Sequence, residues 1–152
     1  MLFRSAILCL TLAVLLGSAG MSWGADLQKG LGLDAYERGD YATALREWQP
    51  LAEQGYADAQ YNLGWMYDNG QGVPQNDKTA VKWYTLAAEQ GNAYAQYNLG
   101  WMYDSGRGVP QDDKTAVKWY RLAAKQGYAY AQSNRGRSEE HTSELQSKAY
   151  LV

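Results

Sequence analysis

Two consecutive segments of this chain have nearly the same sequence. Residues 55–90 and 91–126 align without a gap, and seven of their 36 positions differ, which leaves 29 identities. A third copy begins at Gly127 with GYAYAQ and does not continue. A fixed period of this length is typical of a repeat array, in which each unit stacks on its neighbours. Such an array presents a long surface rather than a buried catalytic pocket.

The charge pattern argues against a nucleic-acid partner. The chain has 14 Lys and Arg residues against 16 Asp and Glu residues, a net charge of −2, and the two signs are mixed along the sequence. Nucleic-acid-binding domains usually carry a basic patch or stripe, and no basic block occurs here. We therefore expect no nucleic-acid partner.

The N-terminus is typical of a secretory signal peptide. Arg4 supplies the positive charge, the segment 6–16 is mainly apolar, and Ser22 and Gly24 place small residues at −3 and −1 of a cleavage site before Ala25. Residues 1–24 are thus the predicted signal peptide, and we expect a periplasmic or secreted protein without a membrane anchor. The alternative is an uncleaved anchor, because residues 5–25 carry no charge and are nearly long enough to span a bilayer.

The repeated unit predicts a pair of helices joined by a loop. Apolar residues recur at helical spacing over residues 57–67 and again over 77–90, with the glycine-rich loop 68–76 between them. Asp77 and its counterpart Asp113 are predicted N-caps of the second helices. Gly64 lies inside the first helix, where glycine costs about 1 kcal/mol relative to alanine. Its recurrence predicts a neighbour that passes too close for a Cβ. Residues 25–54 have the pattern of a further hairpin, with apolar positions Leu27, Leu31, Leu33, Ala35 and Tyr36 in its first arm.

At this point the motifs resemble a known family. AxAQxxLGxxYxxGxGV followed by KxAxxWYxxAAxQG, present in both copies, resembles the Sel1-like repeat, a relative of the tetratricopeptide repeat with a longer loop. Residues 25–54 resemble a tetratricopeptide-type hairpin. The resemblance implies an all-α fold, an α/α superhelical solenoid, and a role as an adaptor or scaffold; bacterial members are often exported. Some members carry a cysteine pair in each repeat, and this chain has none there.

The expected organisation follows from these segments. It consists of the signal peptide 1–24, the hairpin 25–54, the Sel1-like repeats 55–90 and 91–126, the start of a truncated repeat 127–136, and the tail 137–152. Residues 137–147 read RSEEHTSELQS, which resembles the translation of a common sequencing-library adapter, so the tail is expected to be artefactual; the alternative is a genuine polar tail. An array cut short exposes an apolar end, which predicts self-association.

The sequence offers little catalytic chemistry. The one histidine, His141, lies in the tail, and the one cysteine, Cys9, lies in the signal segment. Serine–histidine and cysteine–histidine sites and histidine or thiolate metal sites are therefore not expected. We predict no catalytic residue, no metal, no cofactor and no enzymatic activity. The alternative is a hydrolase or a protein that acts on cell-wall glycans, which needs two carboxylates facing one cleft, one with a raised pKa.

A partner-binding surface is expected on the first helices of the repeats. In a superhelical array these helices line the concave face, and their polar side carries aromatic and amide residues suited to a peptide or protein segment. The candidate residues are Asp58, Tyr61, Asn62, Trp65, Tyr94, Tyr97, Asn98 and Trp101. Two alternatives stay open: Trp65 and Trp101 pack between repeats as ordinary structure, or the fragment has no independent function.

Overall fold

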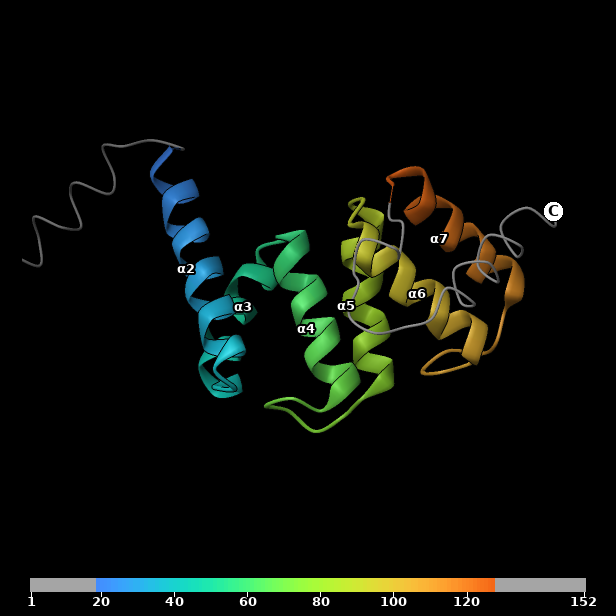
Figure 1. The fold of residues 1–152 in the computed structure, drawn as a ribbon, viewed down its shortest axis with the longest axis horizontal. Coiled ribbons are helices and arrows are strands. Elements are labelled where there is room, and N and C mark those ends of the chain that lie inside the picture. The colour runs from blue at the N-terminus through green and yellow to red at the C-terminus, as the bar shows by residue number, and fades with distance from the viewer. Residues whose placement is uncertain (1–18, 128–152) are drawn as a thin grey trace, which may run out of the picture. The chain divides into compact units, whose positions relative to one another are not determined.

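The structure is a computed structural model that describes residues 19–127, and every regular element in this range is an α-helix (Figure 1). The helices are α2 (Ala19–Glu37), α3 (Tyr41–Glu53), α4 (Ala57–Asn69), α5 (Asp77–Glu89), α6 (Ala93–Ser105) and α7 (Asp113–Lys125). The chain divides into two compact units between Glu47 and Trp48, inside α3. The predicted signal segment up to residue 18 and the tail 137–152 lie outside the described residues. None of the described helices is long and apolar enough to cross a membrane.

The first unit contains α2 and the beginning of α3. Ala35 and Ala44 are fully buried, and the rings of Tyr36 and Tyr41 lie 5.3 Å apart. The backbone N–H of Thr43 donates to Asp40, which caps α3 (3.1 Å). The three leucines expected on the apolar face of α2 are exposed instead, namely Leu27, Leu31 and Leu33.

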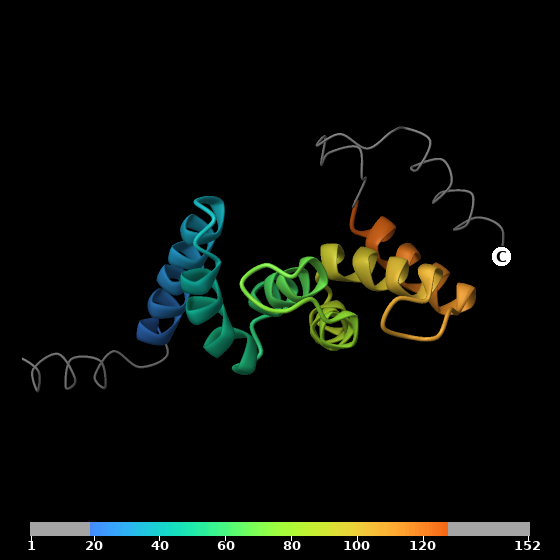
Figure 2. The same cartoon turned by 90° about the horizontal axis from the view of Figure 1, so that it is seen from below.

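The second unit contains two hairpins of the same design, α4–α5 and α6–α7 (Figure 2). Gly70 and Gly106 end the first helices in the left-handed conformation, with φ of 66° and 69°. The second helices begin after Asn76 and Asp112, whose side chains accept free backbone N–H groups of the first turn. The predicted N-caps, Asp77 and Asp113, were therefore wrong by one residue, because the preceding side chain already fills the capping role.

Each hairpin is closed by a glycine against a tyrosine. A Cβ built on Gly64 would lie 2.5 Å from Cδ1 of Tyr84, and one built on Gly100 would lie 2.7 Å from Cδ1 of Tyr120. Atoms of protein side chains do not approach so closely, so only glycine fits at these helical positions. The prediction of a close neighbour at Gly64 is confirmed, and that neighbour is the second helix of the same hairpin.

The core of the second unit joins α5 to α6, so it links one repeat to the next. Its buried residues are Ala80, Val81, Tyr84, Ala87, Ala88, Ala95, Leu99 and Met102. Trp83 is half-buried, and Val81, two residues earlier in α5, is buried. Trp119 is half-buried and packs against this cluster. Met66 and Met102 are fully buried and fill the interior.

A buried glutamine joins each first helix to the end of the preceding helix. Gln60 donates to the carbonyl oxygen of Ala52 (3.1 Å) and accepts from Gln90 (2.7 Å). Gln96 does the same in the next copy, donating to Ala88 (3.1 Å) and accepting from Gln126 (2.8 Å). The backbone N–H groups of Gly55 and Gly91 also donate to these two carbonyl oxygens (3.0 Å each). Each glutamine therefore adds a second donor and ties its helix to the end of the preceding one.

We expect Gly64→Ala to destabilise the chain by about 1–3 kcal/mol, because the added methyl group collides with a fully buried ring. Helix propensity alone favours alanine by about 1 kcal/mol, so the sign of the change reports the collision. Gly30→Ala in α2 is the matched control, since nothing lies within 4 Å of its Cβ position. Urea unfolding should show the control unchanged or more stable. Equal effects at both glycines would contradict the packing argument.

We expect the cap of α7 to be sensitive to acid. Hydrogen bonds from the side chain and backbone of Thr115 hold the pKa of Asp112 below its ordinary value of 3.8. A lowered pKa stabilises the fold above that value, and this stabilisation is lost as pH falls through the folded-state pKa. Asp112→Asn keeps a capping side chain, as Asn76 does in the other copy, without the titration. The difference in Tm between the native chain and this variant should shrink below pH 3.8, whereas Asp112→Ala should lower the Tm at neutral pH.

Candidate functional site

The candidate residues of α4 and α6 differ in how far they reach the surface. Asp58 and Tyr94 are exposed, Tyr94 at 50 %. Tyr97 is buried at 6 % exposure and belongs to a core cluster with Tyr120. The remaining candidates are half-buried, namely Tyr61, Asn62, Trp65, Asn98 and Trp101. The two copies therefore present different surfaces in spite of their similar sequences.

The first helices of the two repeats meet at a small polar and aromatic surface. The ring centroids of Tyr61 and Tyr94 lie 5.7 Å apart, and Tyr61 also lies 6.0 Å from Tyr84. Beside them, Asn92 donates to Oδ1 of Asp58 (3.1 Å). We call Asp58, Tyr61, Asn92 and Tyr94 the tyrosine–aspartate patch. It is the part of the candidate site where residues from both repeats come together with an exposed ring and an exposed carboxylate.

The candidates further along α6 have structural contacts. The ring of Tyr97 lies 5.7 Å from that of Tyr120. The side chain of Asn98 is hydrogen-bonded to the hydroxyl of Tyr84, across the junction between the repeats. Trp101 packs against both core clusters. The packing alternative considered for the tryptophans thus describes Trp101.

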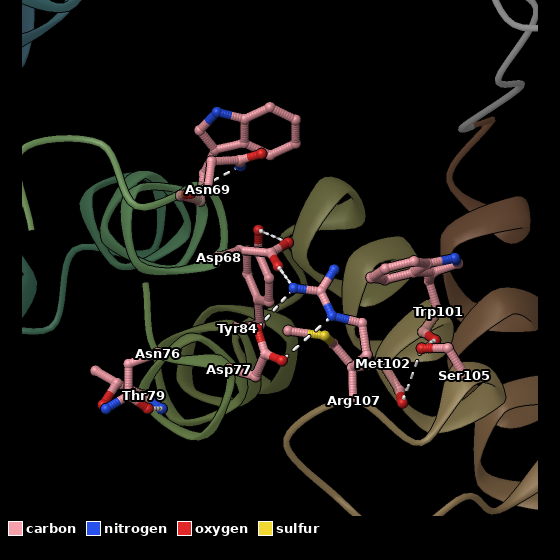
Figure 3. Close-up of polar contacts among 11 residues, drawn as sticks. Asp68, Asn69, Asn76, Asp77, Thr79, Tyr84, Trp101, Met102, Ser105 and Arg107 are labelled. Carbon is pink, nitrogen blue, oxygen red and sulfur yellow. Dashed lines mark hydrogen bonds and ion pairs between the residues drawn. The ribbon is translucent and has the colours of Figure 1, made fainter. Parts of the chain in front are cut away.

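An arginine in the second loop connects the two repeats. Arg107 donates through Nε and Nη2 to the two carboxylate oxygens of Asp77 (3.3 and 2.6 Å), and its Nη2 lies 3.0 Å from Oδ1 of Asp68 (Figure 3). Its guanidinium carbon lies 4.9 Å from the ring centroid of Trp101. We call Arg107, Asp68 and Asp77 the arginine clamp. The same loop approaches so closely that a Cβ on Gly108 would lie 2.5 Å from the carbonyl oxygen of Asp77.

The electrostatics of the clamp follow from its partial burial. Burial raises the pKa of Asp68, and the positive charge of Arg107 opposes this shift. Burial, followed by the charge of Asp68, raises the pKa of Tyr84, whose hydroxyl donates to Oδ2 of Asp68 (3.3 Å). The hydrogen bond to Asp77 raises the pKa of Arg107. The clamp therefore stays charged at neutral pH through its arginine, and the tyrosine stays a neutral donor.

The sequence contained a signal for this clamp that the helical pattern did not reveal. Position 107 is one of the seven that differ between the copies, with Gln71 as its counterpart. The helical pattern predicts Asp77 as an N-cap and places Asp68 at the start of the loop, and neither role indicates a cation partner. The contacts join residues 30 or more positions apart, and local spacing does not predict such pairs.

Two carboxylates lie close together in the described part of the chain. Asp68 and Asp77 are two carboxylates of which one has a raised pKa, which is part of what a glycoside hydrolase requires. However, both carboxylates contact one guanidinium nitrogen of Arg107, so they are already engaged in an internal ion-pair network. Within residues 19–127, no group of three or more His, Cys, Asp or Glu side chains could hold a metal ion.

Comparison with known proteins identifies the repeats. A family model for the Sel1 repeat matches residues 57–92 and 93–128. The Sel1 repeat protein from Oxalobacter formigenes is similar with a TM-score of 0.63 at 34 % identity, over 78 % of this chain and 51 % of that one. A protective antigen of uropathogenic Escherichia coli with an SLR fold is similar with a TM-score of 0.67 at 39 % identity, over 90 % of this chain and 32 % of that one. These likenesses confirm the predicted α/α solenoid class.

The curated relatives are longer proteins. DAP3-binding cell death enhancer 1 of Rattus norvegicus is 39 % identical over 51 residues, which is 34 % of this chain and 10 % of that protein. The exopolysaccharide production negative regulator of Rhizobium leguminosarum bv. viciae is 29 % identical over 96 residues, which is 55 % of this chain and 36 % of that protein. The chain therefore spans a minor part of the length of these relatives.

We expect Arg107→Gln, which introduces the residue of the first copy, to destabilise the chain by about 1 kcal/mol. The value is modest because Arg107 and Asp77 are each about one-third exposed, at 32 % and 33 %, and solvent screens their attraction. Urea unfolding of single and double variants with Asp77→Asn should give a coupling energy of similar size. Arg46→Gln is the control, because this arginine is 71 % exposed. A coupling energy near zero would contradict the clamp.

Proposed function

Because the chain belongs to the Sel1-like repeat proteins, with two such repeats in succession, we propose that it is an exported scaffold that binds a protein or peptide segment on the face of its first helices. Sel1 repeat proteins are generally protein-interaction scaffolds and generally bind protein partners. The observation that carries the proposal for this chain is the tyrosine–aspartate patch. There, the half-exposed Tyr94 of one repeat packs beside Tyr61 of the other, and Asp58 of α4 accepts a hydrogen bond from Asn92.

The physical argument rests on the type of residue and its support. Tyrosine gives a large contact area with a polar edge and loses little conformational entropy on binding. Tyr94 packs beside Tyr61, which itself packs beside the fully buried Tyr84. The exposed ring is therefore held in place by its neighbours, so binding a partner costs little conformational entropy at this side chain. This arrangement favours a binding surface over ordinary solvent exposure.

The proposal includes export and the absence of catalysis. The sequence of residues 1–24 supports export to the periplasm or outside of a bacterial cell. Sel1 repeat relatives are generally non-enzymatic scaffolds, and the carboxylate pair of this chain is engaged by Arg107, so we propose a non-enzymatic role. Expression in a bacterial host, with and without residues 1–24, checks export by fractionation. Retention of the full chain in the cytoplasm would contradict this part.

A random peptide library displayed on phage tests partner binding. We expect Tyr94→Ala to lower the affinity for the selected peptides by about tenfold, because loss of a central aromatic anchor typically costs about 1–2 kcal/mol of binding free energy. The unfolding free energy should change by less than about 0.5 kcal/mol, since half of the side chain is exposed.

Trp101→Ala is the contrasting variant for this experiment. Trp101 packs against two core clusters, so its loss should cost about 2–3 kcal/mol of stability. Peptides that bind Tyr94→Ala as tightly as the native chain would contradict the proposed surface. Failure to select any peptide would contradict the proposed function as a whole.

A further inference from the structure

The charged residues of the first helices are all acidic. In α4 and α6 they are Asp58, Asp68 and Asp104, and neither helix contains Lys or Arg. Apart from Arg107 in the second loop, the basic residues of these repeats lie in the second helices, namely Lys78, Lys82, Lys114, Lys118, Arg121 and Lys125. A partner that approaches the first helices therefore meets aromatic rings and carboxylates. Charge complementarity favours a cationic partner.

The chain already holds one guanidinium group with these two kinds of residue. Arg107 lies over the ring of Trp101 and between the carboxylates of Asp68 and Asp77 (Figure 3). A cation over an aromatic face is attracted by the negative electron density of the ring, and a carboxylate beside it neutralises its charge. The arginine clamp is thus an internal example of how this fold binds a cationic side chain.

The tyrosine–aspartate patch contains the same kinds of group on the surface. Its two rings lie 5.7 Å apart, Tyr94 is 50 % exposed, and Asp58, one turn before Tyr61 in α4, is exposed. Asn92 donates to one oxygen of Asp58 and so fixes its orientation. The carboxylate of Asp58 is exposed, so the donors of a partner can reach it from solvent.

We infer that the tyrosine–aspartate patch binds an arginine side chain of the partner peptide, with its guanidinium over the ring of Tyr94 and its N–H groups donating to Asp58. This inference rests on the proposed function and adds the chemical class of the ligand. The patch combines residues from both repeats, since Asp58 comes from α4 and Tyr94 from α6. These two residues occupy the same position of the repeat, where the copies differ, so neither repeat alone carries both groups.

Titration of the isotopically labelled full chain, followed by NMR chemical shifts, tests the inference. The probe is a capped Gly–Ser peptide that carries two arginines and no other charge, and the control peptide has citrulline in place of arginine. Citrulline keeps the planar shape and part of the N–H donors, but a carbonyl oxygen replaces one NH2 group and the charge is absent. We expect the arginine peptide to bind about tenfold more tightly, with shifts centred on Asp58 and Tyr94, because an exposed cation–π contact and an ion pair each contribute modestly.

Matched variants assign the contacts. Asp58→Asn keeps an acceptor for Asn92 and removes the charge, and Tyr94→Leu removes the ring; each should reduce the affinity for the arginine peptide several-fold. Tyr94→Phe should retain it. Glu89→Gln removes the same charge from the exposed surface of α5 and should have no effect. Raising the ionic strength should lower the affinity for the arginine peptide and leave the affinity for the citrulline peptide unchanged.

The outcomes separate this inference from the proposed function. Equal binding of the arginine and citrulline peptides, or shifts centred away from the patch, would overturn the inference. If library-selected peptides still depended on Tyr94 in that case, the proposed function would stand with a ligand of another chemistry. Loss of both library binding and arginine binding would reject both.

Discussion

The packing of the Tyr84 ring is the interaction on which the rest of the second unit depends. It lies against Gly64 at a distance that leaves no room for a methyl group, and it is fully buried. It also packs beside Tyr61, and its hydroxyl donates to Asp68. Since Asn98 of the next repeat hydrogen-bonds the same hydroxyl, one side chain joins α4, α5 and α6. Tyr120 has the equivalent position against Gly100 in the second copy.

Identical and differing positions of the two repeats have different roles. The identical positions supply what every hairpin needs: the glycine–tyrosine contact, the buried glutamine and the alanines of the core. Three of the differing positions supply contacts found only where the first copy meets the second. Asn92 binds Asp58, Tyr94 packs beside Tyr61, and Arg107 binds Asp77. Three contacts at the junction of the repeats therefore involve positions where the copies differ.

The sequence predicted much of the architecture and less of the site. The period and the helical spacing indicated the hairpins, and the recurrent Gly64 indicated a close neighbour, because backbone constraints are local. The N-caps were displaced by one residue, since adjacent Asn and Asp side chains are both competent to cap. The depth of Tyr97 depends on how α6 packs against α7, and the partners of Arg107 depend on how the second hairpin lies on the first. Neither could be predicted from local spacing. Periodicity within a helix indicates which face is buried, but it does not indicate which residues pack against that face.

The position of Arg107 also has a consequence for how such a chain folds. Tandem units of nearly identical sequence can dock in the wrong order, and misassembly between like units is a characteristic failure of repeat proteins. The hydrophobic faces of α4 and α6 are almost the same, so apolar packing alone distinguishes them poorly. Arg107 pairs with Asp68 and Asp77 only when the second hairpin follows the first, and the first copy has Gln71 at that place. The ion pairs of this one loop residue therefore favour the observed order of docking.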